Sequence, residues 1–252
     1  MRIEFQNGYY QGEVNAEGKM HGHGTYVWHS GTSYEGQFVN GVREGYGVAR
    51  FDDTAIYEGY YHEGQMHGKG RYTYPDGTYY EGDFDSNYFS GRGVRTFADG
   101  AHYEGEFKLD KMHGHGTYYY ADGTVYEGEF VEDMCEGYGR QTFPSGARYE
   151  GQWKADKYHG KGTYTFSDGT YHKGDFADGK YNGYGYHTYA SGDKYGGMWK
   201  DGRMFGDGAY VFASGDVWEG VFDGRNVDSV TVTHPDGTVE YGTVRDAVFI
   251  PG

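Results

Sequence analysis

Seven glutamates recur in this 252-residue chain at the same place in a short motif, and repeated carboxylates could be read as acid–base catalysts. They are Glu35, Glu58, Glu81, Glu104, Glu127, Glu150 and Glu219. Seven copies of one group at the same motif position are more typical of a repeated structural contact than of a catalytic site. We therefore interpret these residues as a structural ladder on a solvated strand face, and we expect no enzyme activity.

Two other motifs for catalysis or cofactor binding are excluded by their spacing. No Gly-x-Gly has a third glycine at the dinucleotide-binding distance, and none continues as Gly-Lys-Ser/Thr. His62 and His67 lie five residues apart, whereas the helical zinc-protease motif needs a spacing of four. The sequence therefore indicates no cofactor.

Histidines are the candidate metal ligands. Four of them recur every 46 residues, at His21, His67, His113 and His159. In a sheet with four strands per 46 residues they would lie ~19 Å apart, too far to share one ion. The pairs His21/His23 and His113/His115 could each give two ligands to a metal held between chains, which would need two more. We interpret Cys135 as an inert packing residue and predict no metal site. As the single cysteine it excludes an internal disulfide and fits a reducing compartment.

A 23-residue repeat organises the chain. A Gly-x-Gly starts at Gly22, Gly45, Gly68, Gly91, Gly114, Gly137, Gly160, Gly183 and Gly206, and another glycine follows fourteen residues after each start. Nine complete copies therefore span 22–228. A partial copy or cap occupies 1–21, and a degenerate copy with a capping tail occupies 229–252.

Each copy predicts a β-hairpin. In the first copy, segments 24–29 and 32–38 flank Ser30-Gly31, and such dipeptides favour hairpin turns because glycine adopts positive φ. Alternation places rings and glycines on one face, and charges and hydroxyls on the other. We expect rings at Trp28, Phe38 and their equivalents to cover all three repeated glycines. With one Leu, 47 Gly and 19% aromatic residues, the prediction is a thin sheet without a central core.

A second rhythm of 46 residues runs through the first strand of each copy. Tyrosine at positions 26, 72, 118, 164 and 210 alternates with Ala49, Arg95, Gln141 and His187. Duplication of paired copies explains this pattern without function. Alternatively, the odd copies present one edge to a partner.

The repeat resembles the MORN (membrane occupation and recognition nexus) repeat, on the evidence of Tyr-Glu-Gly at 34–36, 57–59, 80–82, 103–105, 126–128 and 149–151. Departures occur at Thr54, at His172-Lys173-Gly174, at Tyr195-Gly196-Gly197, and at Ser229 and Thr231. The expected fold is all-β: an elongated, right-handed twisted, single-layer antiparallel sheet of about ten hairpins. The resemblance implies a non-catalytic scaffold or adaptor at cytoskeletal or membrane-associated structures.

The aromatic face is the candidate partner-binding groove, where a peptide or an amphipathic helix could lie. Its predicted residues are Tyr26, Trp28, Tyr34, Phe38, Tyr72, Tyr80, Phe84, Tyr118, Tyr120, Tyr126, Phe130, Tyr149, Trp153, Tyr164, Trp199 and Trp218. One alternative is a surface for phosphoinositide headgroups, although the basic residues Lys69, Arg71, Arg92, Arg95 and Lys161 are scattered and form no cluster. Another is an end-to-end homodimer through the C-terminal edge, if the tail 247–250 does not cap that edge.

Charge and composition narrow the setting. The net charge of −16 disfavours nucleic acid and bulk attraction to anionic lipid. No apolar stretch is long enough for a signal peptide or a membrane span. We expect a cytoplasmic protein at cytoskeletal or membrane-associated structures, whose partner is another protein.

Overall fold

The computed structural model describes residues 1–252, and every regular element in it is a β-strand. There is no helix long and apolar enough to cross a membrane. The chain divides into two compact units. Unit 1 comprises residues 1–121 with 130–133, and unit 2 comprises residues 122–129 with 134–252.

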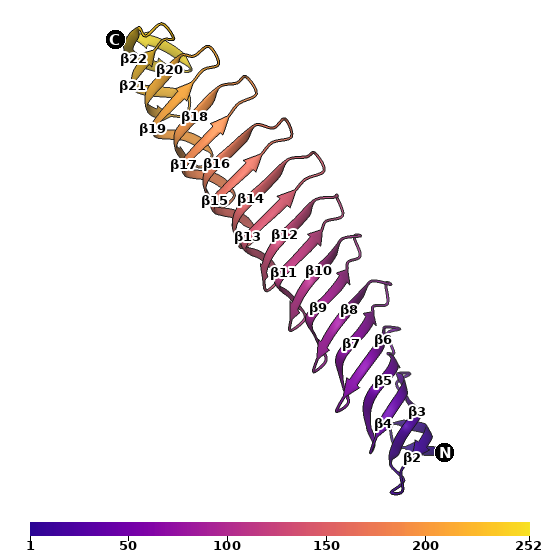
Figure 1. The fold of residues 1–252 in the computed structure, drawn as a ribbon. Helices are drawn as coiled ribbons and strands as arrows, with labels where there is room; N and C mark the ends of the chain where they lie inside the picture. Colours follow the sequence, from indigo (N-terminus) through magenta and orange to yellow (C-terminus); the bar gives the residue numbers. More distant parts are fainter. The chain divides into compact units, whose positions relative to one another are not determined.

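In unit 1 each strand pairs antiparallel with the next one in the chain, as Figure 1 shows for the indigo-to-magenta strands. Its strands are β1 (Arg2–Phe5), β2 (Gly8–Val14), β3 (Met20–Trp28), β4 (Ser33–Val39), β5 (Val42–Arg50), β6 (Ile56–His62), β7 (Gln65–Thr73), β8 (Tyr79–Asp85), β9 (Tyr88–Thr96), β10 (His102–Lys108) and β11 (Lys111–Tyr119).

Unit 2 continues the same pattern of sequential antiparallel pairs from β13 onward. Its strands are β12 (Val125–Val131, mostly in this unit), β13 (Met134–Thr142), β14 (Arg148–Lys154), β15 (Lys157–Thr165), β16 (Tyr171–Ala177), β17 (Lys180–Thr188), β18 (Lys194–Lys200), β19 (Arg203–Val211), β20 (Val217–Asp223), β21 (Asn226–Thr233), β22 (Val239–Arg245) and β23 (Val248–Pro251). The predicted all-β hairpin fold is confirmed.

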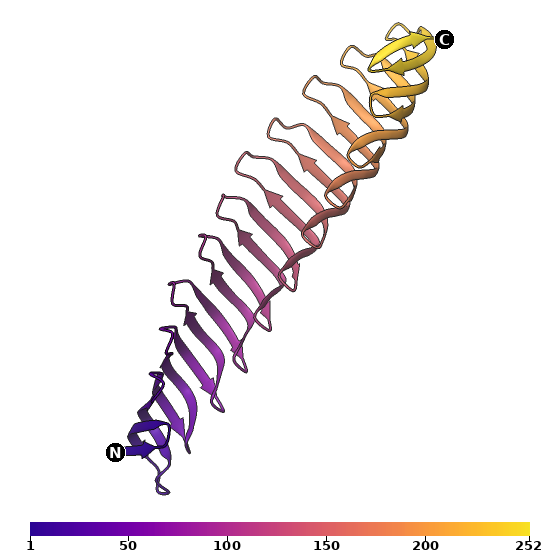
Figure 2. The ribbon, with the colours of Figure 1, turned by 180° about the vertical axis from the view of Figure 1, so that it is seen from behind.

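Two kinds of turn alternate along each unit and follow opposite edges of its sheet (Figure 2). The predicted glycine turn is exemplified by Gly77, whose N–H donates to Tyr74 O at 3.0 Å and whose φ is +86°. The other turn joins one copy to the next through two residues of positive φ, such as Asn40 at 50° and Gly41 at 93°. This pattern is typical of a type I′ turn, which was not among the turns predicted from the sequence.

The repeated glycines serve two different purposes. Gly36 and Gly47 face each other across β4 and β5, so close that a Cβ on Gly36 would lie 2.5 Å from the Gly47 Cα. The first glycine of each Gly-x-Gly is different: Gly45 has φ +76° and lies where the β4–β5 register shifts. It is a β-bulge residue. The prediction that all three glycines are seats for rings is therefore wrong for one of the three.

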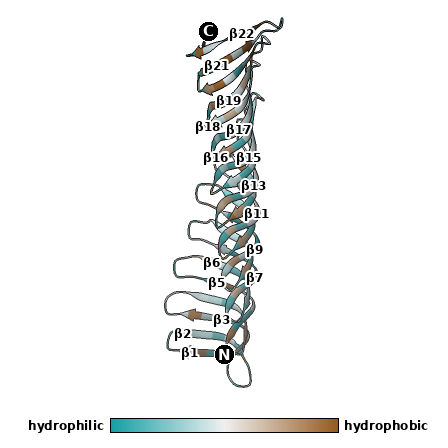
Figure 3. Ribbon diagram, turned by 90° about the vertical axis from the view of Figure 1, so that its left-hand side faces the viewer, coloured by the Kyte–Doolittle hydropathy of each residue, from teal (hydrophilic) through white to brown (hydrophobic).

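Alternation divides each strand into an enclosed face and a solvent face, and Figure 3 shows hydrophobic and hydrophilic residues mixed along the strands. The enclosed face is a true core, made of rings. Its tyrosines Tyr10, Tyr34, Tyr57, Tyr80, Tyr103, Tyr126, Tyr149 and Tyr195 are fully buried. The expected absence of a core is thus wrong. Strongly curved strands enclose large side chains although aliphatic residues are few.

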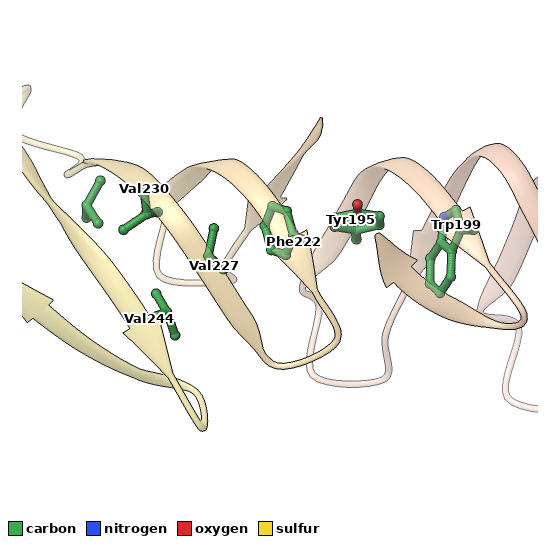
Figure 4. Close-up of a cluster of buried hydrophobic side chains, with 7 residues drawn as sticks. Tyr195, Trp199, Phe222, Val227, Val230 and Val244 are labelled. Atoms are coloured by element: carbon green, nitrogen blue, oxygen red, sulfur yellow. The ribbon is translucent and has the colours of Figure 1, made fainter. Parts of the chain in front are cut away.

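The C-terminal end of unit 2 changes from rings to valines. Figure 4 shows Tyr195, Trp199 and Phe222 followed by Val227, Val230 and Val244 inside the curve of the strands. The last residues form β23, an antiparallel partner of β22. Phe249 of β23 packs against this cluster, so the tail forms an ordered final strand.

Candidate partner-binding surface

The tyrosines of the Tyr-Glu-Gly motif form a buried ladder, which Tyr80 represents. Its ring lies over a glycine pair, since a Cβ on Gly82 or Gly93 would come within 2.6 Å of its side chain. Its hydroxyl donates to Asp83 O at 2.8 Å. Phe107 of the next copy stands edge-on to it, with centroids 4.9 Å apart. The ring that covers the glycines is therefore this tyrosine, and not the Trp28 and Phe38 equivalents that the sequence predicted.

Burial removes ten of the sixteen predicted groove residues from the accessible surface. These are Tyr26, Tyr34, Phe38, Tyr80, Phe84, Tyr126, Phe130, Tyr149, Trp153 and Trp199. Desolvation by burial raises the pKa of Tyr34 to about 12. The indole Nε1 of Trp153 donates to Gly139 O, and that of Trp199 to Gly185 O. These side chains hold the fold together and are not available to a partner.

The other six predicted groove residues keep part of their surface open. They are Trp28, Tyr72, Tyr118, Tyr120, Tyr164 and Trp218. Further half-exposed rings lie beside them at the turn ends of the longer strands, which the predicted set omitted. These are Phe51, Tyr74, Phe97, Phe143, Phe166, Tyr189, Tyr210 and Phe212. Except for Tyr210, which continues the tyrosine series of positions 26, 72, 118 and 164, their signal is a ring four residues after the second glycine of a Gly-x-Gly.

The half-exposed rings gather into clusters of three with a 46-residue period. In unit 1, Tyr72 contacts Phe51 of the preceding copy at 5.8 Å and Tyr74 of its own copy at 5.0 Å. The same arrangement recurs in three other clusters, Phe97–Tyr118–Tyr120 in unit 1, and Phe143–Tyr164–Phe166 and Tyr189–Tyr210–Phe212 in unit 2. We call these four groups the ring clusters. Phe5, Tyr26 and Trp28 make the same contacts in unit 1, but their central ring, Tyr26, is buried. The 46-residue alternation has a structural consequence: each odd copy supplies the central ring that joins two copies.

In the even copies, other residue types occupy the strand position that the central tyrosine of a ring cluster has in the odd copies. In unit 2, Gln141 accepts a hydrogen bond from the Tyr158 hydroxyl at 2.8 Å, and His187 contacts Tyr189 at 4.4 Å. In unit 1, Ala49 is buried, whereas Arg95 is half-buried over Phe97, 5.2 Å from the ring centroid. The surface along the ring clusters is therefore aromatic, with one guanidinium in unit 1.

His172 replaces the ladder tyrosine in one copy of unit 2. The imidazole is fully buried and stacks on Tyr181 with centroids 3.6 Å apart. Neither ring nitrogen has a hydrogen-bond partner. Desolvation, reinforced by the neighbouring His187, lowers the pKa of His172 to about 3, so the ring is neutral at pH 7. The sequence departure at this position thus produces a polar defect in an otherwise satisfied aromatic core.

The glutamate ladder lies on the opposite face, in solvent. Glu81 pairs with Arg71 at 3.3 Å and Glu127 pairs with Arg140 at 2.9 Å. Side chains on neighbouring strands make these contacts, and such exposed pairs contribute little to stability. The arrangement fits a structural ladder.

No group of three or more His, Cys, Asp or Glu side chains is placed to hold a metal ion. Cys135 is buried, and His67 lies 3.5 Å from Asp85 in a surface pair.

Together the hairpins, the glycine pairs and the buried tyrosine ladder define an all-β repeat protein. The profile of the MORN repeat matches nine consecutive segments: 10–33, 34–54, 57–79, 80–102, 103–125, 126–148, 149–171, 172–194 and 195–217. The chain belongs to the MORN-repeat family.

Comparison with solved structures gives distant likenesses. The TCP10 domain of Danio rerio CPAP, in complex with a STIL peptide, is 14% identical at a TM-score of 0.44; the match covers 91% of this chain and 96% of that one. The TCP domain of Drosophila melanogaster SAS-4, in complex with a proline-rich motif of Ana2, is 15% identical at a TM-score of 0.30, over 69% and 83%. Comparison with curated proteins gives no match.

Proposed function

We propose that this protein is a non-enzymatic scaffold or adaptor that binds a peptide or helix of a protein partner along its ring clusters. The observation that carries the proposal is the row of half-exposed rings in mutual contact, for example Phe97, Tyr118 and Tyr120. Rings of this kind offer a large apolar area and are enriched where proteins bind one another. Their spacing along a regular sheet suits an elongated ligand.

The fold supports this function by separating two tasks. The ladder tyrosines are satisfied within the core, whereas the ring clusters lie outside the glycine pairs and keep accessible surface. A partner can therefore cover the clusters without disturbing the core. We further propose, from the family resemblance, that the protein works in the cytoplasm at cytoskeletal or membrane-associated structures.

Phosphoinositide binding receives less support from the charges. Lys69 pairs with Asp83 at 2.7 Å, Lys161 with Asp175 at 2.7 Å, and Arg71 with Glu81. These basic side chains have carboxylate neighbours and form no cluster of the kind that recognises anionic lipid.

The function is tested by capture of partners from a cell lysate with matched variants. Tyr74→Ala with Tyr120→Ala removes rings from two clusters of unit 1. Tyr46→Ala with Tyr60→Ala makes the same change at two exposed tyrosines of the other face. We expect the first variant to lose partners that the wild type and the second variant both retain. Equal partner sets for all three proteins would contradict the proposal.

Flotation with lipid vesicles distinguishes binding of a protein partner from binding of phosphoinositide headgroups. The proposed scaffold should not float with phosphatidylcholine vesicles that contain a phosphoinositide, at low or high salt. Salt-sensitive flotation, unchanged by the Tyr74→Ala and Tyr120→Ala substitutions, would favour the lipid alternative.

A further inference from the structure

Arg95 of β9 stands out among the arginines of the chain. Arg43 and Arg95 are half-buried, whereas the other arginines are exposed. Arg43 uses its Nη2 to donate to Gly64 O at 2.6 Å. Arg95 makes no ion pair and no side-chain hydrogen bond, and its Nε is buried without a partner. An arginine carries five N–H donors, so its unburied Nη groups can still bind an acceptor.

Rings surround this guanidinium. Its carbon lies 5.2 Å from the centroid of Phe97 and 5.9 Å from that of Phe89. The chain carries a net charge of −16, yet no carboxylate pairs with Arg95. A half-desolvated cation on an aromatic surface attracts an anionic group more strongly than an exposed one, because water screens it less.

The register places Arg95 midway between two ring clusters. Tyr72 pairs with Tyr80, Tyr80 with Arg95, Arg95 with Tyr103, and Tyr103 with Tyr118. These five residues therefore form one line across β7 to β11. Arg95 lies two strands from Tyr72 and two strands from Tyr118, which corresponds to ~9.6 Å on each side.

A polyproline II helix matches this spacing. It rises about 3.1 Å per residue with three residues per turn, so side chains three residues apart share one face ~9.3 Å apart. A β-strand places residues three apart on opposite faces. Aromatic-lined surfaces are also the usual docking sites for polyproline II segments.

We propose that the surface of unit 1 carrying Tyr72, Arg95 and Tyr118 binds a polyproline II segment with a large apolar residue, an acidic residue and a second large apolar residue at i, i+3 and i+6. The carboxylate accepts hydrogen bonds from the Arg95 guanidinium, and the apolar side chains contact the ring clusters on either side. This inference rests on the proposed function and specifies its ligand.

Unit 2 lacks this acid preference, because the corresponding positions are Gln141 and His187. Gln141 already accepts from Tyr158, and the Nδ1 of His187 is buried without a partner. Acid recognition is therefore a property of unit 1.

The test uses the full chain and a labelled peptide, Pro-Pro-Leu-Pro-Pro-Asp-Pro-Pro-Leu-Pro-Pro, in fluorescence anisotropy. A second peptide has Asn in place of Asp. Each is titrated with the wild type, with Arg95→Gln and with Arg71→Gln, a matched loss of one arginine on the other face. We expect the Asp peptide to bind the wild type and Arg71→Gln equally. Loss of a charge-assisted hydrogen bond weakens binding by about tenfold to a hundredfold.

The two changes should be coupled: the Asp-to-Asn change matters for the wild type and not for Arg95→Gln. Equal binding of both peptides by the wild type, a result independent of any folding defect, would overturn the inference. So would tighter binding of a helical peptide with Leu, Asp and Leu at i, i+7 and i+14. A third outcome separates the two proposals. If the double variant Tyr74→Ala, Tyr120→Ala loses binding but Arg95→Gln keeps it, acid recognition by Arg95 is contradicted and the proposed function still stands.

Discussion

Tyr57 stands edge-on to Phe84 of the following copy, with ring centroids 4.9 Å apart and planes at 80°. Tyr57 also stands edge-on to Tyr61 of its own hairpin, at 5.2 Å. The same pattern recurs through the ladder of each unit. Copies are therefore joined by ring contacts as well as by backbone hydrogen bonds, and removal of one ladder ring should weaken two copies.

Tyr80 allows the ring and the hydroxyl to be separated. Tyr80→Phe keeps the ring contacts but removes the hydrogen bond to Asp83 O, so we expect a loss of about 1 kcal/mol in the free energy of unfolding. Tyr80→Ala also removes the ring and should cost about 3–5 kcal/mol. Urea denaturation followed by circular dichroism measures both. Similar losses for the two variants would show that the ring is not the main contributor.

Gly196 and Gly197 provide a matched pair on β18. A Cβ at Gly197 would lie 2.6 Å from the Gly208 Cα, so Gly197→Ala should cost about 1–3 kcal/mol through overpacking. A Cβ at Gly196 would make only ordinary contacts, with the Tyr186 ring at 3.6 Å and the Tyr184 hydroxyl at 3.9 Å. Gly196→Ala should therefore stabilise by roughly 0.5–1 kcal/mol, because it removes a strand glycine. Thermal unfolding compares them, and equal effects would contradict the close packing of the glycine pair.

Thr54 takes the place of a turn glycine at φ +75°. A β-branched residue is strained there, so Thr54→Gly should stabilise unit 1 by about 1 kcal/mol. Thr25→Gly, the same change within β3, should destabilise because the strand position has ordinary φ. Thermal unfolding measures both variants. Destabilisation by Thr54→Gly would mean that the turn carries no strain.

His172 should make unit 2 sensitive to acid. Its pKa is about 3 in the folded protein, and an unfolded histidine titrates near 6.5, so between these values the unfolded state binds more protons. Stability is then complete above about pH 6.5 and falls as the pH decreases, by up to about 1.4 kcal/mol per pH unit. His172→Tyr restores the ladder and removes this loss. Tyr149 stacked on Tyr158 shows that a tyrosine fits in such an arrangement.

Unfolding at pH 7 and pH 5 tests the effect. The advantage of His172→Tyr over the wild type should grow by roughly 2 kcal/mol between the two pH values. His187, whose pKa burial also lowers, is present in both proteins and so largely cancels. An advantage independent of pH would contradict burial of a neutral imidazole.

The hairpins could be predicted from sequence because each signal is local: a period of 23 residues, a turn glycine, and alternation along a strand. The type I′ turns were missed although Asn40-Gly41 and Asp178-Gly179 are typical signals for them, because other copies have Leu109-Asp110 or Ala155-Asp156 at this place and the signal does not repeat. The division of rings into core and surface was also missed. Tyr34 and Tyr72 look equivalent in a flat alternating strand, but curvature buries the first and leaves the second half-exposed.

The sequence identified Arg95 as an interruption of a tyrosine series and as one of several scattered basic residues. Its lack of an ion pair depends on where the neighbouring strands β8 and β10 place their acidic side chains, which alternation alone does not show. The His172 defect has the same origin: one substitution became a buried, unpartnered imidazole only through the stacking of Tyr181.

Photo-crosslinking from two positions of unit 1 tests the central claim most directly. A benzophenone amino acid is introduced in place of Tyr74, in a ring cluster, or in place of Tyr60, an exposed tyrosine of the opposite face. After irradiation in cells, we predict covalent protein adducts from position 74 and none of comparable yield from position 60. Adducts from position 60 alone would place the partner on the glutamate face and contradict the account.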